Sequence, residues 1–127
     1  MWDYFLLPAS YEEKMKRVVV TGLGINSSIG QNKEEVLSSL REGKSGISFC
    51  PEYAERGFRS QIHGDPKIDL DSVMDRKQRR FMGDGAAYNY IAMKEAILDA
   101  GLEEKDVSNV NTGLIMGSGG PSTKNLL

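Results

Sequence analysis

Three consecutive valines, Val18 to Val20, constrain the fold of this chain more than any other feature of its sequence. An uninterrupted run of β-branched residues has no polar face to present to water, so it predicts a strand that is buried on both faces. Strands of this kind are typical of α/β proteins, in which helices cover both sides of a sheet. Thr21 and Gly22 end the run. The expected fold class is therefore α/β.

A helix is expected after a tight turn, between Asn32 and Gly43. Asn32 has a side chain suited to capping the helix, and Glu35 stands at the third helical position, where it completes a capping box. Gly43 is suited to end the helix, because glycine readily adopts the left-handed conformation that follows the last turn. One face of this helix carries the apolar residues Val36, Leu37 and Leu40. The expected order is thus strand, turn, helix.

Residues 44–74 contain several glycines and prolines and show no sustained periodicity, so they predict an ordered excursion with one short strand or helix. A longer helix is expected from about Asp75 to Ala100, where apolar residues recur at helical spacing. Gly83 and Gly85 lie inside it, and each should cost about 0.5–1 kcal/mol relative to alanine. We expect these glycines to let another backbone pack closely against the helix.

The two ends of the chain have different expected roles. Thr112 to Met116 predict a second buried strand, which leads into a glycine-rich loop from Gly117 to Pro121. Two strands and two helices close a sheet poorly, so the chain is expected to be part of a larger domain. Met15 has the features of a natural start, and residues 1–14 are expected to be a disordered upstream extension. Their short apolar run predicts neither a secretory signal nor a membrane span.

Composition excludes several classes of function. The 127 residues carry a formal net charge of −2, which gives no reason to expect nucleic acid or a membrane as the partner. Cys50 is the only cysteine and His63 the only histidine, so no internal disulfide, cysteine-based zinc site or catalytic triad is expected. Cys50 is expected to be a small core residue, because no base or oxyanion site stands near it in the sequence. No metal or cofactor is expected, and a reducing cytoplasm is the expected compartment.

The motif Gly22-Leu23-Gly24 after the first strand allows a dinucleotide-binding interpretation, because glycines there let a pyrophosphate approach a helix N-terminus. The fingerprint requires glycine or alanine at position 27, where Ser27 stands, and Gly30 comes three residues too late. A glycine-permitted tight turn is the favoured interpretation. A nucleotide-binding α/β domain is kept as an alternative, and it predicts that NAD raises the melting temperature.

A cluster of basic residues opens the long predicted helix, directly after its expected cap Asp75. The cluster consists of Arg76, Lys77, Arg79 and Arg80. Positive charge at a helix N-terminus opposes the helix dipole, so a reason other than helix stability is expected for these residues. Two interpretations remain open from the residues alone, a solvated face or a docking patch for an anionic partner.

Several stretches together resemble the condensing-enzyme family of β-ketoacyl-(acyl-carrier-protein) synthases, closest to the synthase I type of bacterial fatty-acid synthesis. They are residues 16–24, 27–30, 40–47, 75–77 with 80–82, 99–102 and 113–120. The resemblance covers nearly all of residues 15–127, and the stretches stand in the family's order. It implies a thiolase-like fold built from two related βαβαβ halves and usually assembled as a homodimer. Residues 15–127 would be only the beginning of the first half.

The resemblance also implies a reaction, the decarboxylative Claisen condensation that elongates fatty acids. In the family, an acyl chain moves from its carrier protein to a cysteine, two histidines assist decarboxylation of malonyl-ACP, and the resulting carbanion attacks the thioester. The cysteine and both histidines are expected beyond Leu127. No catalytic residue is therefore assigned within the chain, and the 127 residues alone are expected to be inactive. An alternative is a catalytically silent partner of an active ketosynthase, of the chain-length-factor kind.

The partner that the resemblance implies is acyl carrier protein carrying acyl and malonyl groups. This acidic protein docks, in the family, on basic residues at the start of the helix that begins here at Asp75. The docking residues carried over are Arg76, Lys77 and Arg80. Arg79 is an additional charge that the closest family pattern lacks.

Overall fold

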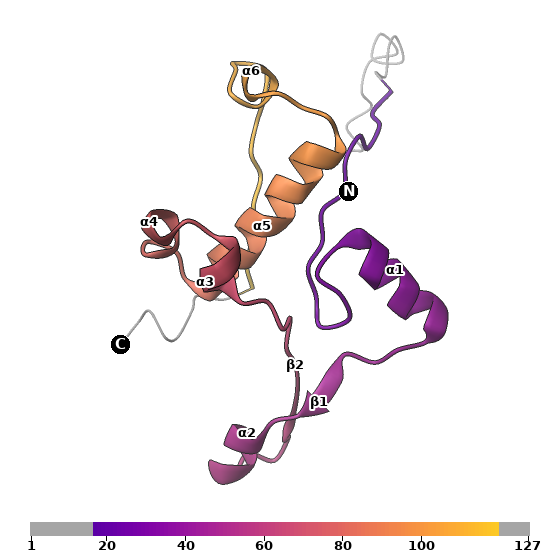
Figure 1. The fold of residues 1–127 in the computed structure, drawn as a ribbon, viewed down its shortest axis with the longest axis vertical. Coiled ribbons are helices and arrows are strands. Elements are labelled where there is room, and N and C mark those ends of the chain that lie inside the picture. The colour runs from indigo at the N-terminus through magenta and orange to yellow at the C-terminus, as the bar shows by residue number, and fades with distance from the viewer. Residues whose placement is uncertain (1–16, 120–127) are drawn as a thin grey trace, which may run out of the picture.

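A computed structural model describes residues 17–119 of the chain (Figure 1). Within this range the elements are α1 (Lys33–Glu42), β1 (Ile47–Phe49), α2 (Pro51–Glu55), β2 (Ile62–Gly64), α3 (Leu70–Val73), α4 (Arg76–Arg79), α5 (Asp84–Asp99) and α6 (Glu104–Val107). β1 and β2 pair antiparallel, with Ser48 opposite His63. Helices and a sheet are both present, which confirms the α/β class in its broad sense. The predicted extension, residues 1–14, lies outside the described range, as do residues 120–121 of the glycine-rich loop.

Helix α1 forms where the sequence predicts it. The side chain of Asn32 accepts a hydrogen bond from the Glu35 amide at 2.9 Å, and Gly43 ends the helix with a φ of 66°. The reciprocal bond of the capping box differs, since the Glu35 carboxylate accepts from the amide of Gln31 at 2.9 Å. Amides that precede the first helical turn have no intrahelical acceptor, so this carboxylate satisfies the amide of the residue before the cap.

The tight turn before α1 lies later than predicted. Ser27 and Gly30 exchange two backbone hydrogen bonds, of 2.8 and 3.3 Å, and so enclose the turn at residues 28–29. Gly22 and Gly24 lie in extended chain, and neither has a positive φ. The prediction of a turn at the Gly22-Leu23-Gly24 motif is therefore wrong.

The two glycines of the motif serve a close contact with α5. A Cβ placed on Gly22 would lie 2.8 Å from the Cβ of Ala100, and one placed on Gly24 would lie 2.7 Å from the backbone nitrogen of Ala96. Real Cβ atoms are not found that close to a backbone atom, so only glycine lets the extended chain lie directly on the helix. The helix occupies the space beside the motif that a bound pyrophosphate would need, which argues against dinucleotide binding there.

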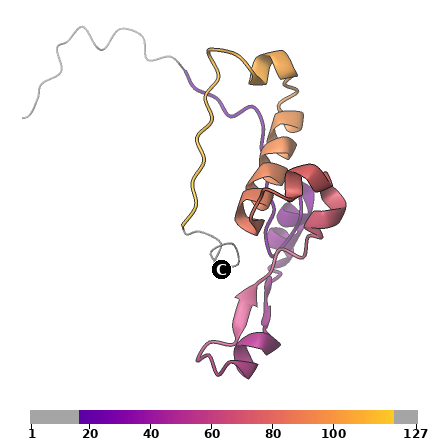
Figure 2. The same ribbon diagram turned by 90° about the vertical axis from the view of Figure 1, so that its left-hand side faces the viewer.

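Residues 47–64 form an arm that projects from the rest of the molecule in both ribbon views (Figure 1, Figure 2). The arm contains β1, β2 and, between them, α2, so the predicted excursion at 44–74 has more regular structure than the single short element expected. Cys50 precedes α2 and is 5% exposed, and its amide donates to the Gln61 carbonyl at 2.8 Å. The prediction that Cys50 is a small buried residue is confirmed.

The long helix predicted from Asp75 to Ala100 is broken into α4 and α5. Gly83 stands before α5 in an extended conformation, with φ −68° and ψ 163°. Two glycines within three residues make this the weakest place for a helix, and the first turn of α5 gains from the negative charge of Asp84 instead. The expectation of close packing is wrong for Gly85, which has no atom within 4 Å of its Cβ position.

Neither predicted buried strand forms within the described residues. Val18 and Val20 are 92% and 88% exposed, and Ile115 is 95% exposed. Residues 111–119 run as an extended trace outside the sheet (Figure 2). A strand requires a neighbouring strand to pair its backbone groups, and no described segment pairs with either run. The two apolar runs favour a strand conformation, but a strand forms only where a distant segment of chain pairs with it.

A small core links the helices that follow the arm. Three residues are buried at its centre: Leu70 in α3, Met74 directly after α3, and Ala87 in α5. The half-buried residues packed against them are Ile68, Met82, Tyr88, Tyr90 and Ile91. This core packs α3 against α5, and α4 lies on the outer side of α3 (Figure 1). None of the helices in residues 17–119 is long and apolar enough to cross a membrane.

Candidate functional site

Three exposed basic side chains form the most distinctive surface of the described chain. We call Arg76, Lys77 and Arg80 the basic corner; they lie on and directly after α4, the short helix at the outer side of α3 (Figure 1). The carboxylate of Asp75 caps the short helix by accepting a hydrogen bond from the Lys77 amide at 2.6 Å. Buried Met74 anchors the chain immediately before this cap. The three charges are thus presented to solvent by a turn that is held at its start.

Arg79, the fourth member of the basic cluster, has a different environment. Its side chain is 20% exposed, and its guanidinium forms an ion pair with Asp84 of α5 and donates to the Met82 carbonyl. The Nε of Arg79 also lies 3.5 Å from a carboxylate oxygen of Asp71 in α3. Among residues 17–119, ion pairs offset the charge of Arg79, whereas none forms at the three residues of the basic corner.

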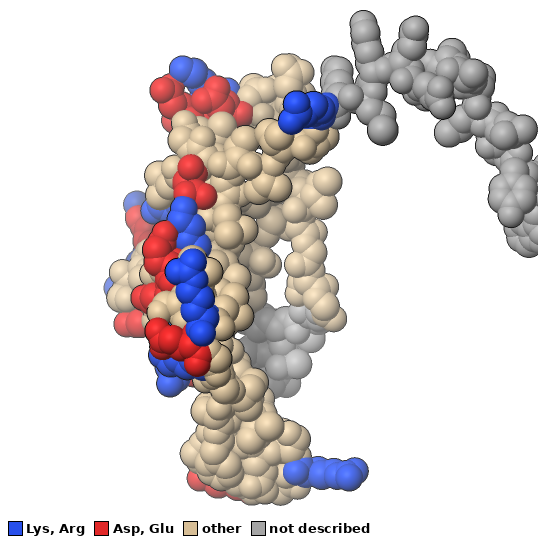
Figure 3. Space-filling view, turned by 90° about the vertical axis from the view of Figure 1, so that its right-hand side faces the viewer, with Lys and Arg blue, Asp and Glu red and all other residues tan. Residues whose placement is uncertain are grey.

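The face of the molecule that carries α1 has a different charge pattern. Acidic and basic side chains alternate over it without a large area of one sign (Figure 3). At the basic corner, by contrast, Asp71 and Asp84 pair with Arg79 and Asp75 caps α4, so no ion pair forms at the other three charges within residues 17–119. A surface of this kind suits an acidic partner, since unpaired charge speeds encounter and sets orientation.

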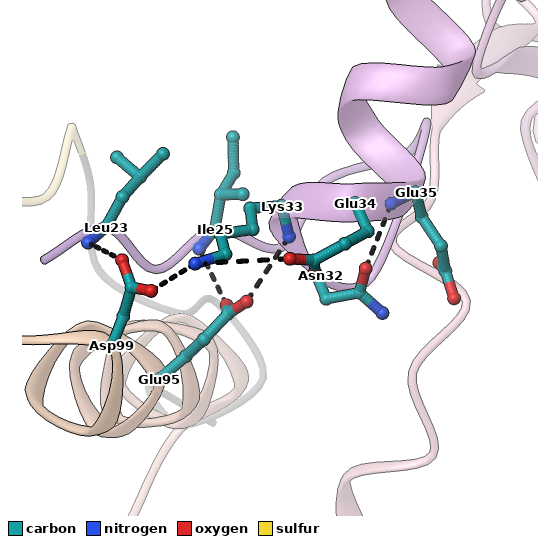
Figure 4. Close-up of polar contacts among 8 residues, drawn as sticks. All are labelled: Leu23, Ile25, Asn32, Lys33, Glu34, Glu35, Glu95 and Asp99. Atoms are coloured by element: carbon teal, nitrogen blue, oxygen red, sulfur yellow. Dashed lines mark hydrogen bonds and ion pairs between the residues drawn. The ribbon is translucent and has the colours of Figure 1, made fainter.

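A second polar cluster joins α5 to the chain that precedes α1 (Figure 4). The carboxylate of Glu95 accepts hydrogen bonds from the amides of Ile25 at 2.9 Å and Lys33 at 3.2 Å. One turn later, the carboxylate of Asp99 accepts from the Leu23 amide at 3.0 Å and forms an ion pair with the Lys33 ammonium. We call Glu95 and Asp99 the carboxylate clasp, because together they hold the extended chain against α5.

The clasp alters the pKa values of its charged members. The hydrogen bond from Lys33, with that from the Leu23 amide, lowers the pKa of Asp99 below its ordinary value. The same bond to Asp99 raises the pKa of Lys33. Both shifts favour the charged forms, and all four carboxylate oxygens of the clasp accept hydrogen bonds or ion pairs. The clasp therefore holds the structure together and offers no free base for catalysis.

Sequence reasoning did not single out the clasp or the acids around Arg79. A signal for the clasp exists, since Glu95 and Asp99 stand four residues apart and so share one helix face. Lys33 is a second signal, because a cation at the first position of a helix opposes the dipole unless it has a partner.

The remaining candidates are not brought together. Cys50 and His63 lie in the arm, where the ring of His63 contacts Tyr53 edge-on with centroids 5.7 Å apart. No group of three or more potential metal ligands occurs within residues 17–119. The observations define an α/β segment whose unusual surface is a solvent-exposed basic corner.

Residues 15–127 match the family described as "Beta-ketoacyl synthase, N-terminal domain". The chain belongs to this family, which confirms the resemblance noted from its motifs. The protein named 3-oxoacyl-[acyl-carrier-protein] synthase 1 in Haemophilus influenzae is 56% identical over 113 residues, 89% of this chain and 28% of that protein.

Two further relatives separate the types of synthase. The protein of the same name in Escherichia coli K12 is 52% identical over 111 residues, 87% of this chain and 27% of that protein. The protein named 3-oxoacyl-[acyl-carrier-protein] synthase 2 in Vibrio harveyi is 33% identical over 105 residues, 82% of this chain and 25% of that protein. Similarity is thus higher to the type 1 proteins, and the chain spans about a quarter of the length of these relatives.

Proposed function

We propose that the chain forms the opening part of a β-ketoacyl-ACP synthase, a transferase that elongates fatty acids by decarboxylative Claisen condensation of an acyl-enzyme with malonyl-ACP. The family match over residues 15–127 and the two synthase 1 relatives support this proposal. The proposed whole protein has a thiolase-like fold, acts as a cytoplasmic homodimer, and takes its nucleophilic cysteine and two histidines from sequence beyond Leu127.

Within this enzyme, the basic corner is the docking surface for acyl carrier protein. The observation that carries this assignment is the separation of Arg79, which is paired and mostly buried, from Arg76, Lys77 and Arg80, which are exposed without ion pairs in the described residues. Three unopposed positive charges on one turn attract an acidic protein over a distance of about one Debye length, roughly 8 Å at physiological salt.

Charge reversal tests the docking surface in the extended protein, by which we mean the chain expressed with the coding sequence that follows Leu127. The variant Arg76→Glu/Lys77→Glu/Arg80→Glu should weaken carrier-protein binding by about tenfold, since three exposed pairs are each worth a fraction of a kcal/mol. The dissociation constant is measured by titration at low and high salt, and the loss should shrink at high salt.

A matched control reverses three exposed basic residues elsewhere. Arg41→Glu/Lys44→Glu/Arg59→Glu makes the same change in net charge, and these side chains lie on α1, after it, and in the arm. Its effect on the dissociation constant should be much smaller. Equal losses in the two triple variants would show that net charge, not the basic corner, governs binding.

The condensation itself is tested separately. The extended protein should convert acyl-ACP and malonyl-ACP into β-ketoacyl-ACP with release of carbon dioxide and one free carrier protein. If the sequence beyond Leu127 lacks the cysteine and histidines and no turnover is seen, the chain-length-factor alternative replaces the enzyme.

A further inference from the structure

Arg79 joins three helices around the basic corner. It belongs to α4, its Nη2 forms an ion pair with Asp84 at the start of α5, and its Nε lies 3.5 Å from Asp71 of α3. Its Nη1 donates to the Met82 carbonyl, in the turn between α4 and α5. The Nε atom is buried and donates no hydrogen bond within the described residues, so its contact with Asp71 is an ion pair only. This side chain therefore connects the segment that carries the basic corner to both of its neighbours.

The basic corner needs such a connection because α4 is only four residues long. A single turn of helix is not stable by itself, since forming its first hydrogen bonds costs more conformational entropy than they return. Arg76 and Lys77 lie on this turn, and Arg80 follows at its end. The direction in which the three charges point thus depends on what holds α4 and the turn at residues 80–83.

We propose that Arg79 and Asp84 are a positioning pair that orients the basic corner toward its acidic partner. This inference rests on the proposed docking function and deepens it. Arg79 itself does not contact the partner, because only 20% of its side chain is exposed and its donors face Asp84, Asp71 and Met82. Its role is to keep Arg80 and the preceding turn in one arrangement, which lowers the entropy lost when the partner binds.

The positioning pair and simple charge counting predict opposite effects of Asp84→Asn on the affinity for an acidic protein. Asp84→Asn removes a negative charge near the basic corner, so charge counting predicts tighter binding of an acidic protein. A positioning pair predicts weaker binding, by about three- to tenfold, because Arg79 is released and the turn loosens. Asp71→Asn is the matched comparison: it makes the same charge change at the longer contact of Arg79, where the Asp71 side chain is 84% exposed. It should change binding much less than Asp84→Asn does.

A charge swap distinguishes pairing from damage to the fold. Arg79→Asp alone should weaken carrier-protein binding, and adding Asp84→Arg should recover much of the loss, since the pair is restored with unchanged net charge. Far-ultraviolet circular dichroism of each extended protein checks folding. Amide hydrogen exchange at residues 80–83 should be faster in Asp84→Asn than in Asp71→Asn, a change that loss of charge alone does not cause.

The outcomes separate the two proposals. If reversal of Arg76, Lys77 and Arg80 weakens binding while Asp84→Asn tightens it or matches Asp71→Asn, the positioning pair is rejected and docking stands. If the triple reversal leaves binding unchanged, the docking surface itself is wrong. If Asp84→Asn does not fold, the charge swap decides: the pair is rejected if Arg79→Asp/Asp84→Arg binds no more tightly than Arg79→Asp alone.

Discussion

Gly24 lies directly against Ala96 of α5, so closely that a Cβ on the glycine would be 2.7 Å from the backbone nitrogen of the alanine. The extended chain and the helix are therefore in backbone contact. Ala92, Ala96 and Ala100 have small side chains, so the extended chain can approach the backbone of this helix face. The Gly22-Leu23-Gly24 motif, for which the sequence favours a tight turn and leaves dinucleotide binding as an alternative, is a packing surface.

Enlarging Gly24 should destabilise the protein. Gly24→Ala forces the extended chain away from α5, and overpacking of this kind costs about 1–3 kcal/mol in the free energy of unfolding. Chemical denaturation of the extended protein measures the change. Gly85→Ala is the control, because its Cβ position is open and it lies within a helix, where alanine should stabilise by about 0.5–1 kcal/mol. If Gly24→Ala stabilised the protein as Gly85→Ala does, or left the free energy of unfolding unchanged, the close contact would be contradicted.

Removing one clasp carboxylate should loosen the same contact. Glu95→Gln keeps one acceptor oxygen, but its amide group faces a backbone amide that also donates, so one bond is lost. Leaving a half-buried donor unsatisfied costs about 1–3 kcal/mol. The neighbouring exposed residue provides the control, since Lys94→Gln should change the free energy of unfolding by less than about 0.5 kcal/mol. Equal effects at the two positions would argue that Glu95 is not a clasp residue.

The ion pair between Lys33 and Asp99 predicts a specific pH dependence. Because the pKa of Asp99 is lowered in the folded chain, its contribution is present above the ordinary value of 3.8 and is lost as pH falls through the lowered value. The pKa of Lys33 is raised, so its contribution is present below 10.5 and is lost as pH rises through the raised value. The stability difference between wild type and Asp99→Asn should therefore be largest between these limits and shrink toward both. Parallel stability curves across the whole range would contradict the ion pair.

NAD should leave the melting temperature unchanged. Helix α5 fills the space beside Gly22 and Gly24 that a dinucleotide's pyrophosphate would occupy. A ligand that binds only the folded state raises the melting temperature increasingly as its concentration exceeds its dissociation constant, so thermal denaturation with and without excess NAD is a direct test. A concentration-dependent rise would revive the nucleotide-binding alternative.

Local signals in the sequence predicted local structure well. Asn32 and Gly43 bound α1 as expected, because capping depends on residues only a few positions apart. The buried state of Cys50 also followed from its chemistry. The sequence does not predict the break between α4 and α5, since the apolar spacing continues through Gly83 despite the cost of two nearby glycines. The broad class and the family followed from ordered motifs.

The candidate site was predicted only in part. The sequence identified four basic residues in one cluster, but it could not show that Arg79 turns toward Asp71 and Asp84 while the other three remain exposed. The family pattern distinguishes Arg79 from the other three residues because the pattern lacks a charge at this position. The structure shows how its environment differs, since Asp71 of α3 and Asp84 of α5 both form ion pairs with its guanidinium.

The bounds of α1, the α/β class and the family can be predicted from residue order alone, because they depend on the sequence of residue types and on interactions within a helical turn. Tertiary structure alone decided the contact of Gly24 with α5, the carboxylate clasp and the pairing of Arg79. The hydrogen bond from Leu23 to Asp99 spans 76 positions of the chain, and Lys33 meets Asp99 across 66. Such partners are chosen by which surfaces pack together, and no local propensity encodes that choice.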